Sequence, residues 1–189
     1  MTIAIIVGVL IVCALALIFT FNSLVGLRNQ VLNAFRQIDV QLKRRYDLIP
    51  NLVNSVKGEM KFEQSTLEKV IQARAAAMTA VGSGNMQDIM AKEGALTQTL
   101  GKLMALAENY PNLKANDSVK TLMEELTHTE NQIGFARQFY NDITTKFNTQ
   151  QQLFPNNVFA SLLGFSAAEL FEVPRDSQER EAPKVDLAV

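Results

Sequence analysis

The feature that most constrains this chain is an uninterrupted apolar run at its start. Every residue from Ile3 to Phe19 is apolar or glycine, and Thr20 and Phe21 extend the run without adding a charge. A helix needs about 20 such residues to cross a hydrocarbon core of roughly 30 Å. No lysine or arginine precedes the run and no small-residue cleavage site closes it, as a signal peptide would require. The sequence therefore predicts an uncleaved transmembrane anchor over residues 1–22.

Basic residues follow this anchor on one side only. Arg28, Arg36 and the triplet Lys43, Arg44 and Arg45 come after the run, whereas the other side offers only the terminal amine. By the positive-inside rule, the N-terminus then lies outside the cell and the remainder of the chain lies in the cytoplasm. We expect a single-pass protein whose first partner is the lipid bilayer.

The remaining composition excludes several classes of protein. The chain has 18 basic and 19 acidic residues, so its net charge of -1 gives no general attraction to nucleic acid. The single cysteine, Cys13, lies inside the apolar run, so the chain has no disulfide framework. A length of 189 residues leaves room for the anchor and one modest domain.

Apolar residues at three- and four-residue spacing predict four long helices after the anchor. They cover residues 22–56, 62–80 and 86–110, and a fourth helix runs from a cap at Asp117 or Ser118 to residue 154. Pro50 predicts a kink or a restart in the first of them, and Gly82 and Gly84 predict a reversal after the second. The predicted fold class is all-α, a transmembrane helix that continues into an up-and-down four-helix bundle over residues 23–155.

An apolar segment and a charged tail follow the bundle. Residues 156–173 include Phe159, Leu162, Leu163 and Phe165, and residues 166–169 match a capping box that opens a short turn. If the chain reverses after each helix, this segment returns to the bilayer and forms a membrane-proximal or subunit-contact patch. If the first two helices form one rod, it lies far from the membrane. Residues 174–189 are charged and contain proline, which predicts disorder.

The sequence offers no recognisable catalytic or metal-binding set. His128 is the single histidine, and we interpret Glu124, Glu125 and Glu130 around it as a solvated acidic face rather than a Glu-x-x-His metal site. The glycines near residue 83 lack the lysine and the strand of a phosphate loop. We therefore expect no enzyme activity, no catalytic residue, no cofactor and no bound metal.

The densest basic cluster is the triplet Lys43, Arg44 and Arg45. It follows the anchor by about 20 residues, or 30 Å, well beyond a Debye length of about 8 Å, so a role in lipid binding is disfavoured. We interpret it as a solvated face that pairs with acidic residues of a neighbouring helix or subunit. The predicted assembly surface combines it with polar residues beside the apolar seams: Arg28, Asp39, Lys43, Arg44, Arg45, Asn131, Arg137, Tyr140 and Asn141.

Motifs along most of the chain resemble the signature of the LemA family. They include Ile38-Asp39-Val40-Gln41-Leu42-Lys43-Arg44-Arg45, Asp47-Leu48-Ile49-Pro50-Asn51-Leu52-Val53, Tyr110-Pro111-x-Leu113-Lys114-Ala115 and Ala136-Arg137-x-Phe139-Tyr140-Asn141. The resemblance implies a bacterial inner-membrane protein with a short external N-terminus and a cytoplasmic helical bundle. It also implies a frequent association with membrane metalloproteases of the HtpX type, and with magnetosome-membrane machinery for some relatives.

Two functions follow from these observations. The first is a non-catalytic, membrane-anchored scaffold that forms a homo-oligomer by coiled-coil-like packing of its long helices, and so organises a membrane patch or a protein assembly. The second is an adaptor or stress-signalling partner of an HtpX-type protease, with the tail and the apolar patch as its contact surfaces.

Overall fold

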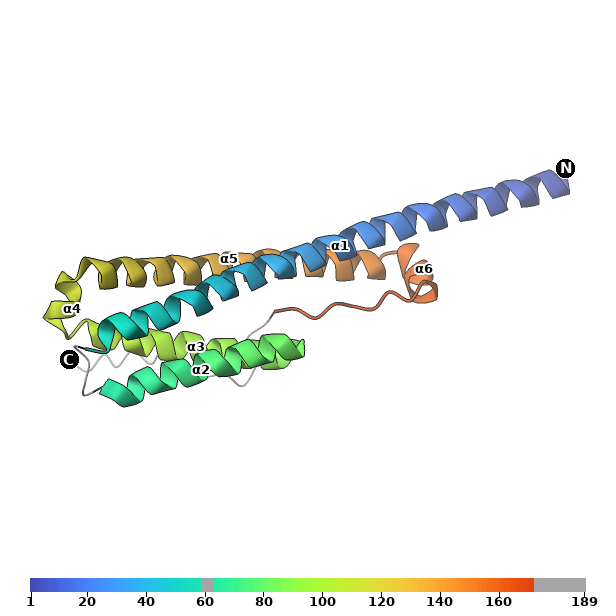
Figure 1. The fold of residues 1–189 in the computed structure, drawn as a ribbon. Coiled ribbons are helices and arrows are strands. Elements are labelled where there is room, and N and C mark those ends of the chain that lie inside the picture. Colours follow the sequence, from blue (N-terminus) through green and yellow to red (C-terminus); the bar gives the residue numbers. More distant parts are fainter. Residues whose placement is uncertain (59–62, 172–189) are drawn as a thin grey trace, which may run out of the picture. The chain divides into compact units, whose positions relative to one another are not determined.

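Six helices make up the secondary structure of the residues that the computed structural model describes, which are 1–58 and 63–171 (Figure 1). They are α1 (Thr2–Val56), α2 (Gln64–Ser83), α3 (Met86–Ala107), α4 (Pro111–Ala115), α5 (Asp117–Gln152) and α6 (Asn156–Leu162). Because this part of the chain contains no strand, the all-α fold class is confirmed. The tail predicted to be disordered, residues 174–189, lies outside the described residues.

The chain forms two compact units, each of which is described by itself. Of the described residues, the anchor unit contains 1–40 and 134–170, and the four-helix unit contains 41–58, 63–133 and 171. Helices α1 and α5 each contribute one part to the anchor unit and the other part to the four-helix unit.

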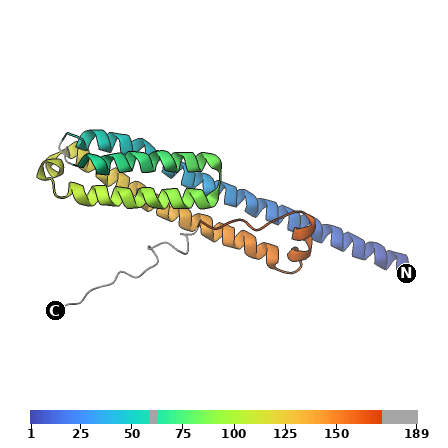
Figure 2. The ribbon, with the colours of Figure 1, turned by 90° about the horizontal axis from the view of Figure 1, so that it is seen from below.

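The four-helix unit is an up-and-down bundle of the last part of α1, α2, α3 and the first part of α5 (Figure 2). Apolar residues at three- and four-residue spacing on each helix point inward, as the periodicity predicts. The buried members are Leu42, Ile49, Leu52, Val53 and Val56 of α1, Leu67, Val70, Ala77 and Ala80 of α2, Ile89, Leu96, Leu100 and Leu103 of α3, and Val119, Leu126 and Ile133 of α5. The predicted helical bundle is thus confirmed.

A glycine and an asparagine make the tight reversal between α2 and α3. Gly84 has a φ of 72°, and its N–H donates to the carbonyl oxygen of Val81 at 3.3 Å. Glycine is favoured here because an L side chain is strained at positive φ. Asn85 then caps α3, since its side-chain oxygen accepts the Asp88 N–H at 3.1 Å. The reversal predicted from the two glycines is confirmed.

Three local predictions need correction. Helix α1 continues through Pro50 to Val56, so of the kink or restart predicted at Pro50 the restart is wrong. Helix α4 begins at Pro111, where the sequence predicts only a stop; proline is well suited to the first turn, because an N–H there has no helical acceptor. The cap of α5 is Asn116, whose Oδ1 accepts the N–H groups of residues 118 and 119, instead of Asp117 or Ser118.

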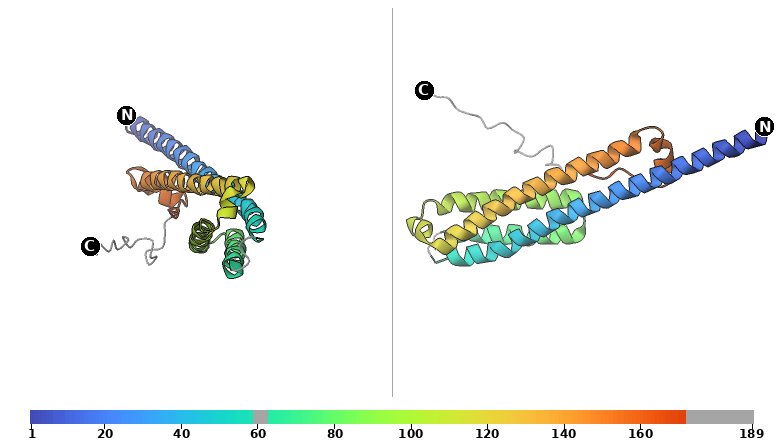
Figure 3. Two further views of the ribbon diagram at one scale, coloured as in Figure 1. Left: turned by 90° about the vertical axis from the view of Figure 1, so that its left-hand side faces the viewer. Right: turned by 90° about the horizontal axis from the view of Figure 1, so that it is seen from above.

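The anchor unit pairs the first part of α1 with the second part of α5, and the two run side by side beyond the apolar run (Figure 3). Helix α1 carries an 18-residue window of mean hydropathy 3.1 in which no residue is buried, so by length and composition it is able to cross a membrane. After that window, one stripe of α1 becomes buried: Leu24, Leu27, Val31, Ala34 and Ile38.

Candidate functional site

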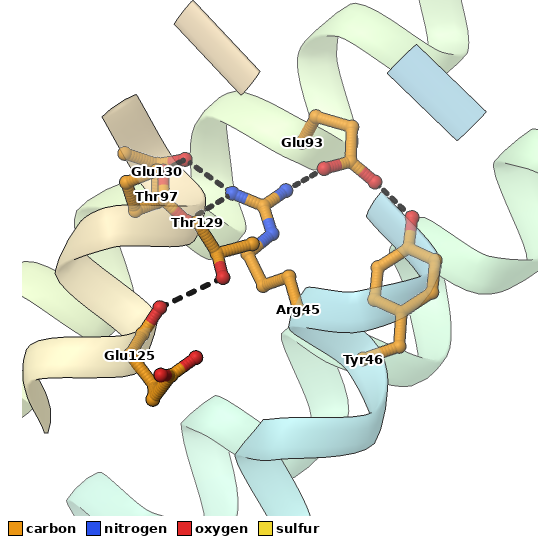
Figure 4. A network of polar contacts seen from close by, with 7 residues as sticks. All are labelled: Arg45, Tyr46, Glu93, Thr97, Glu125, Thr129 and Glu130. Atoms are coloured by element: carbon orange, nitrogen blue, oxygen red, sulfur yellow. Dashed lines mark hydrogen bonds and ion pairs between the residues drawn. The ribbon is translucent and has the colours of Figure 1, made fainter. Parts of the chain in front are cut away.

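A network of charged and polar side chains lies buried inside the four-helix unit (Figure 4). The Arg45 guanidinium forms ion pairs with Glu93 of α3 and Glu130 of α5, and its Nη1 lies 2.6 Å from Glu130 Oε1. The same Nη1 donates to Thr97 Oγ1 at 2.9 Å, and the Thr97 hydroxyl donates to Glu130 Oε2 at 3.2 Å. One side chain of α1 is thereby connected to both α3 and α5.

The phenol of Tyr46 extends this network on the other side of Glu93. Its hydroxyl donates to the Glu93 carboxylate, and both side chains are buried. Arg74 Nε of α2 donates to the backbone carbonyl of Tyr46 at 2.7 Å. Each of the other three helices of the unit, α2, α3 and α5, therefore makes a polar contact with residue 45 or 46 of α1.

Burial of Arg45 contradicts the prediction that it belongs to a solvated basic face. Its exposed fraction is 0%, whereas Lys43 and Arg44 are exposed. The cause is helical geometry, because Arg45 lies three residues after Leu42 and four before Ile49, within the inward stripe. Glu93 holds the matching position in α3, four residues after Ile89 and three before Leu96.

The predicted solvated acidic face of α5 is also wrong in part. Glu125 pairs with Arg44 at the surface, where both side chains are nearly half exposed. Glu130 is mostly buried and belongs to the Arg45 network. The expected pairing of the basic triplet with a neighbouring helix is therefore made within this chain by Arg44 and Arg45.

The network joins α1, α3 and α5 and so holds these helices in register. A fully buried guanidinium balanced by two carboxylates is costly to break, because removing one charge leaves the other unpaired and out of water. Polar residues at seam positions fix the register of packed helices in the same way. Within residues 1–58 and 63–171, no group of three or more His, Cys, Asp or Glu side chains is placed to hold a metal ion.

His128 and Asn131 are exposed on α5. Both line an open hollow of about 640 Å³ at the α4 end of the four-helix unit, with Ala107, Glu108, Leu113, Lys120, Met123, Glu124 and Thr127. The exposed position of His128 agrees with the prediction. Asn131, which is part of the predicted assembly surface, lines this hollow.

In the anchor unit, the chain after α6 runs back along α5 as an extended segment. Asn148 of α5 holds it by two hydrogen bonds of 2.8 Å, donating from Nδ2 to the Ala168 carbonyl and accepting the Ala168 N–H at Oδ1. The Tyr140 hydroxyl donates to the Glu169 carbonyl at 2.8 Å. Residues 165–170 are not helical, so the capping box predicted at 166–169 is wrong.

Tyr140 is internal, which is a correction to its predicted place on an assembly surface. Only 4% of it is exposed, and its ring packs edge-on against Phe35 of α1, with ring centroids 5.9 Å apart. Burial raises the pKa of its phenol, the hydrogen bond from Thr144 opposes this, and Glu169 adds to the increase.

The other predicted polar residues of the anchor unit lie closer to solvent. Arg28 is exposed, whereas Asp39, Arg137 and Asn141 are partly buried. Burial raises the pKa of the Asp39 carboxyl above its ordinary value of 3.8. Asp39 Oδ1 is shielded from solvent and accepts no hydrogen bond from the described residues.

A tight helix ending joins α6 to the extended segment. Gly164 has a φ of 73°, its N–H donates to Ser161 O at 3.3 Å, and the Phe165 N–H donates to Ala160 O at 3.0 Å. These two bonds define a Schellman motif, which satisfies the last carbonyls of a helix and turns the chain. Phe165 is thereby directed toward the two long helices.

Phe165 and Asn156 attach the α6 region to the end of the apolar run. The Phe165 ring packs edge-on against Phe21 of α1 and Phe147 of α5, with centroid distances of 6.1 and 6.4 Å. The Thr20 hydroxyl donates to Asn156 Oδ1 at 3.1 Å. Of the two arrangements that the sequence leaves open, the structure has the one in which the apolar segment returns to the anchor.

The predicted patch itself divides into inward and outward side chains. Phe159 and Phe165 are partly buried, whereas Leu162 and Leu163 are exposed. Sequence reasoning misses Phe154 and Val158, which are also exposed and share the four-residue spacing of Leu162.

These features define an all-helical protein with one candidate membrane-spanning helix, a buried charge network and an apolar anchor end. The family model of the LemA family matches residues 34–187. The chain is 28% identical over 164 residues to Protein LemA of Metamycoplasma hominis, covering 84% of this chain and 74% of that protein. The chain belongs to the LemA family.

Magnetosome proteins are further relatives. Magnetosome protein MamQ 2 of Paramagnetospirillum magneticum is 25% identical over 179 residues, covering 82% of this chain and 66% of the relative. Magnetosome protein MamQ of Magnetospirillum gryphiswaldense is 23% identical over 178 residues, covering 82% and 65%. The matched region thus spans just under two thirds of the length of these relatives. Family membership and these relatives agree with a membrane-associated helical protein.

Proposed function

We propose that this protein is a non-catalytic, membrane-anchored scaffold that self-associates in the plane of the membrane, with its helical body in the cytoplasm. The observation that supports this most directly is a pair of exposed aromatic side chains on α5. Phe135 and Phe139 are 66% and 45% exposed, and a spacing of four residues places them on one face of the helix. Leu32 and Val40 of α1 are exposed in the same unit. Exposed large apolar side chains that gather on one helix face, as Phe135 and Phe139 do, mark an interaction site.

Phe135 and Phe139 lie too far from the hydrocarbon layer for lipid to bury them. Tyr140, the neighbour of Phe139, packs against Phe35, which lies 14 residues after Phe21 in α1. At 1.5 Å per residue this is about 20 Å beyond the end of the apolar run, outside the hydrocarbon layer. The face is therefore suited to a protein partner.

A second copy of the same chain fits this geometry. Copies that cross the same bilayer in the same direction present Phe135 and Phe139 at the same height. A rotation axis along the membrane normal then pairs like faces, the commonest arrangement in symmetric oligomers. Confinement to the membrane also raises the effective concentration of each copy for the next.

The relatives support a role at a membrane. Two of them are named as magnetosome proteins. From these names we infer for this chain only that it organises a membrane patch or proteins on it. The buried Arg45 network supports a structural role for the four-helix unit, since it joins α1, α3 and α5 there.

The test is the mass of the full-length protein in mild detergent, measured by light scattering with the detergent contribution subtracted. We expect an oligomer for the natural chain and a shift to smaller species for the double variant Phe135→Ser, Phe139→Ser. Both side chains are exposed, so the fold should change in stability by no more than about 0.5 kcal/mol each. The matched control is Ile71→Ser with Met78→Ser, two exposed apolar residues of α2, which should leave the mass unchanged.

A monomeric natural chain at micromolar concentration would exclude the scaffold. Our second proposal would then take its place: an adaptor that binds a membrane metalloprotease of the HtpX type, with the exposed face of Phe135 and Phe139 as a contact surface in addition to the predicted tail and apolar patch. In that case the same double variant should lose capture of the protease, whereas the α2 control should retain it.

A further inference from the structure

The α6 region presents apolar side chains that no described residue covers. Phe154, Val158 and Leu162 are 84%, 57% and 78% exposed. They recur every four residues, and Val158 and Leu162 lie on one face of α6. Leu153 and Leu163 beside them are also exposed.

The region is also free of charge. Residues 147–168 contain no Asp, Glu, Lys or Arg, and neither do residues 1–27 of α1. These two uncharged stretches meet in the anchor unit, where Phe165 packs against Phe21 and Thr20 bonds Asn156. The first charged residues beyond them are Arg28, Lys146 and Glu169. The uncharged surface of the apolar run therefore continues onto α6.

The contact with Phe21 sets the height of this surface relative to the bilayer. Twenty residues from Thr2 to Phe21 span about 30 Å, the thickness of the hydrocarbon core. Phe21 and the α6 region beside it thus lie at the boundary between acyl chains and headgroups. Arg28, seven residues further and about 10 Å deeper into the cytoplasmic side, lies among or beyond the headgroups.

We propose that the α6 segment, residues 153–163, is a second membrane-contacting element, which inserts Phe154, Val158 and Leu162 into the interfacial layer of the bilayer that α1 crosses. Segments that lie in this layer bury their apolar face by about 5–10 Å. The occupant of the exposed face is lipid, because its nearest structural neighbour is the end of a lipid-facing helix.

Backbone N–H groups at both ends of this segment are hydrogen-bonded within the chain, which suits a layer poor in water. Asn157 and Val158 donate their N–H groups to Leu153 O at 2.9 Å and Pro155 O at 3.2 Å. At the other end, the N–H groups of residues 163, 164 and 165 are all bonded to carbonyls of α6. An unpaired backbone group is costly in the membrane, so this closure favours insertion.

Two membrane contacts constrain the protein more than one. A single helix leaves the anchor unit free to rotate about α1, whereas a second contact selects the rotation in which α6 faces lipid. This inference does not depend on self-association, because lipid contact and oligomer mass are measured separately.

The absence of tryptophan from the chain permits a direct test. The single variant Leu162→Trp is made in the full-length protein, which is reconstituted into phosphatidylcholine vesicles carrying bromine at defined acyl positions. We expect quenching by bromine placed near the headgroups to exceed quenching by bromine near the chain ends. Phe19→Trp in the apolar run is the positive control, and Phe139→Trp of α5 should not be quenched.

Val158→Trp is the second reporter, and circular dichroism checks that each variant retains its helices. If Phe19→Trp is quenched and neither α6 reporter is, the proposal is overturned, whether protein or water covers the patch. Aqueous iodide distinguishes those two cases, because it quenches a tryptophan in water and not one covered by protein.

Discussion

Arg45 and Glu93 form an ion pair between α1 and α3 in which neither side chain is exposed. Glu130 provides a second carboxylate, so the guanidinium is balanced by charges from two helices. Taking these groups out of water is costly, and only their mutual contacts repay that cost. The pair therefore makes the four-helix unit intolerant of change at a small number of positions.

Glu93→Gln should destabilise the protein strongly. Removing one charge of a buried pair typically costs about 3–5 kcal/mol, because the remaining charge is left without its partner. Thermal unfolding of the full-length protein in detergent, followed by circular dichroism, measures the effect. The matched control is Glu125→Gln, whose partner Arg44 is nearly half exposed, and which should cost no more than about 1 kcal/mol. Equal losses for the two variants would contradict the burial of Arg45.

Asn148→Ala should release the extended segment that follows α6. The side chain makes two hydrogen bonds to Ala168, one to its carbonyl and one from its N–H. Amide hydrogen exchange at Ala168 should accelerate by at least about tenfold, which corresponds to a loss of about 1.4 kcal/mol of local protection. Exchange within α5 itself should change little.

Gln138→Ala provides the comparison for this experiment. Gln138 is an exposed residue of the same helix, so its loss should leave exchange at Ala168 unaltered. If the exchange rate at Ala168 is the same in both variants, Asn148 does not hold the segment, which is then held by its other contacts, such as the Tyr140 hydrogen bond to Glu169.

The burial of Arg45 was predictable from the sequence, although the type of residue argues against it. Leu42, Arg45 and Ile49 follow the three-four spacing of an inward stripe, and Glu93 has the same relation to Ile89 and Leu96. Periodicity outweighs the usual exposure of charged residues when two opposite charges occupy facing stripes. The helices themselves, the reversal at Gly84 and the return of the apolar segment to the anchor follow from local pattern and length.

The extended segment after α6 lacks such a signal. Its conformation depends on Asn148, 20 residues away, and on Tyr140, 29 residues from Glu169. A half-buried amide that bonds a backbone far along the chain produces no periodic sequence pattern. Residues 166–169 do match the local pattern of a capping box, which predicts a helix start instead of the extended conformation. Short helices such as α4 are likewise set by their surroundings, because four or five residues are too few to form a stable helix alone.

Two glycine-to-alanine substitutions in the four-helix unit should have opposite effects. Gly84→Ala places a side chain at a φ of 72° and should cost about 1 kcal/mol. Gly101→Ala lies in the interior of α3, where an added Cβ meets no atom within 4 Å, and should stabilise by about 0.5–1 kcal/mol. Unfolding temperatures should therefore shift in opposite directions. A gain from Gly84→Ala would show that the α2–α3 reversal has another backbone conformation.

Asp39→Asn should raise stability at neutral pH. Burial raises the pKa of the Asp39 carboxyl above its ordinary value, so the folded state disfavours the charged form. Since the folded protein binds this proton more tightly than the unfolded chain does, the carboxylate costs stability above the raised pKa. This cost disappears as the pH falls through the raised pKa of Asp39, because the carboxyl group is then protonated and neutral. A neutral amide avoids the cost at every pH.

Unfolding temperatures measured between about pH 4 and pH 8, a range that includes the start of carboxyl titration, test this expectation. The variant should be more stable than the natural chain at pH 7, and the difference should narrow as the pH is lowered. Asp142→Asn changes an exposed carboxyl of α5 in the same unit and should leave the stability at pH 7 unaltered. A loss of stability in Asp39→Asn at pH 7 would mean that the Asp39 carboxylate gains more from its surroundings than its burial costs.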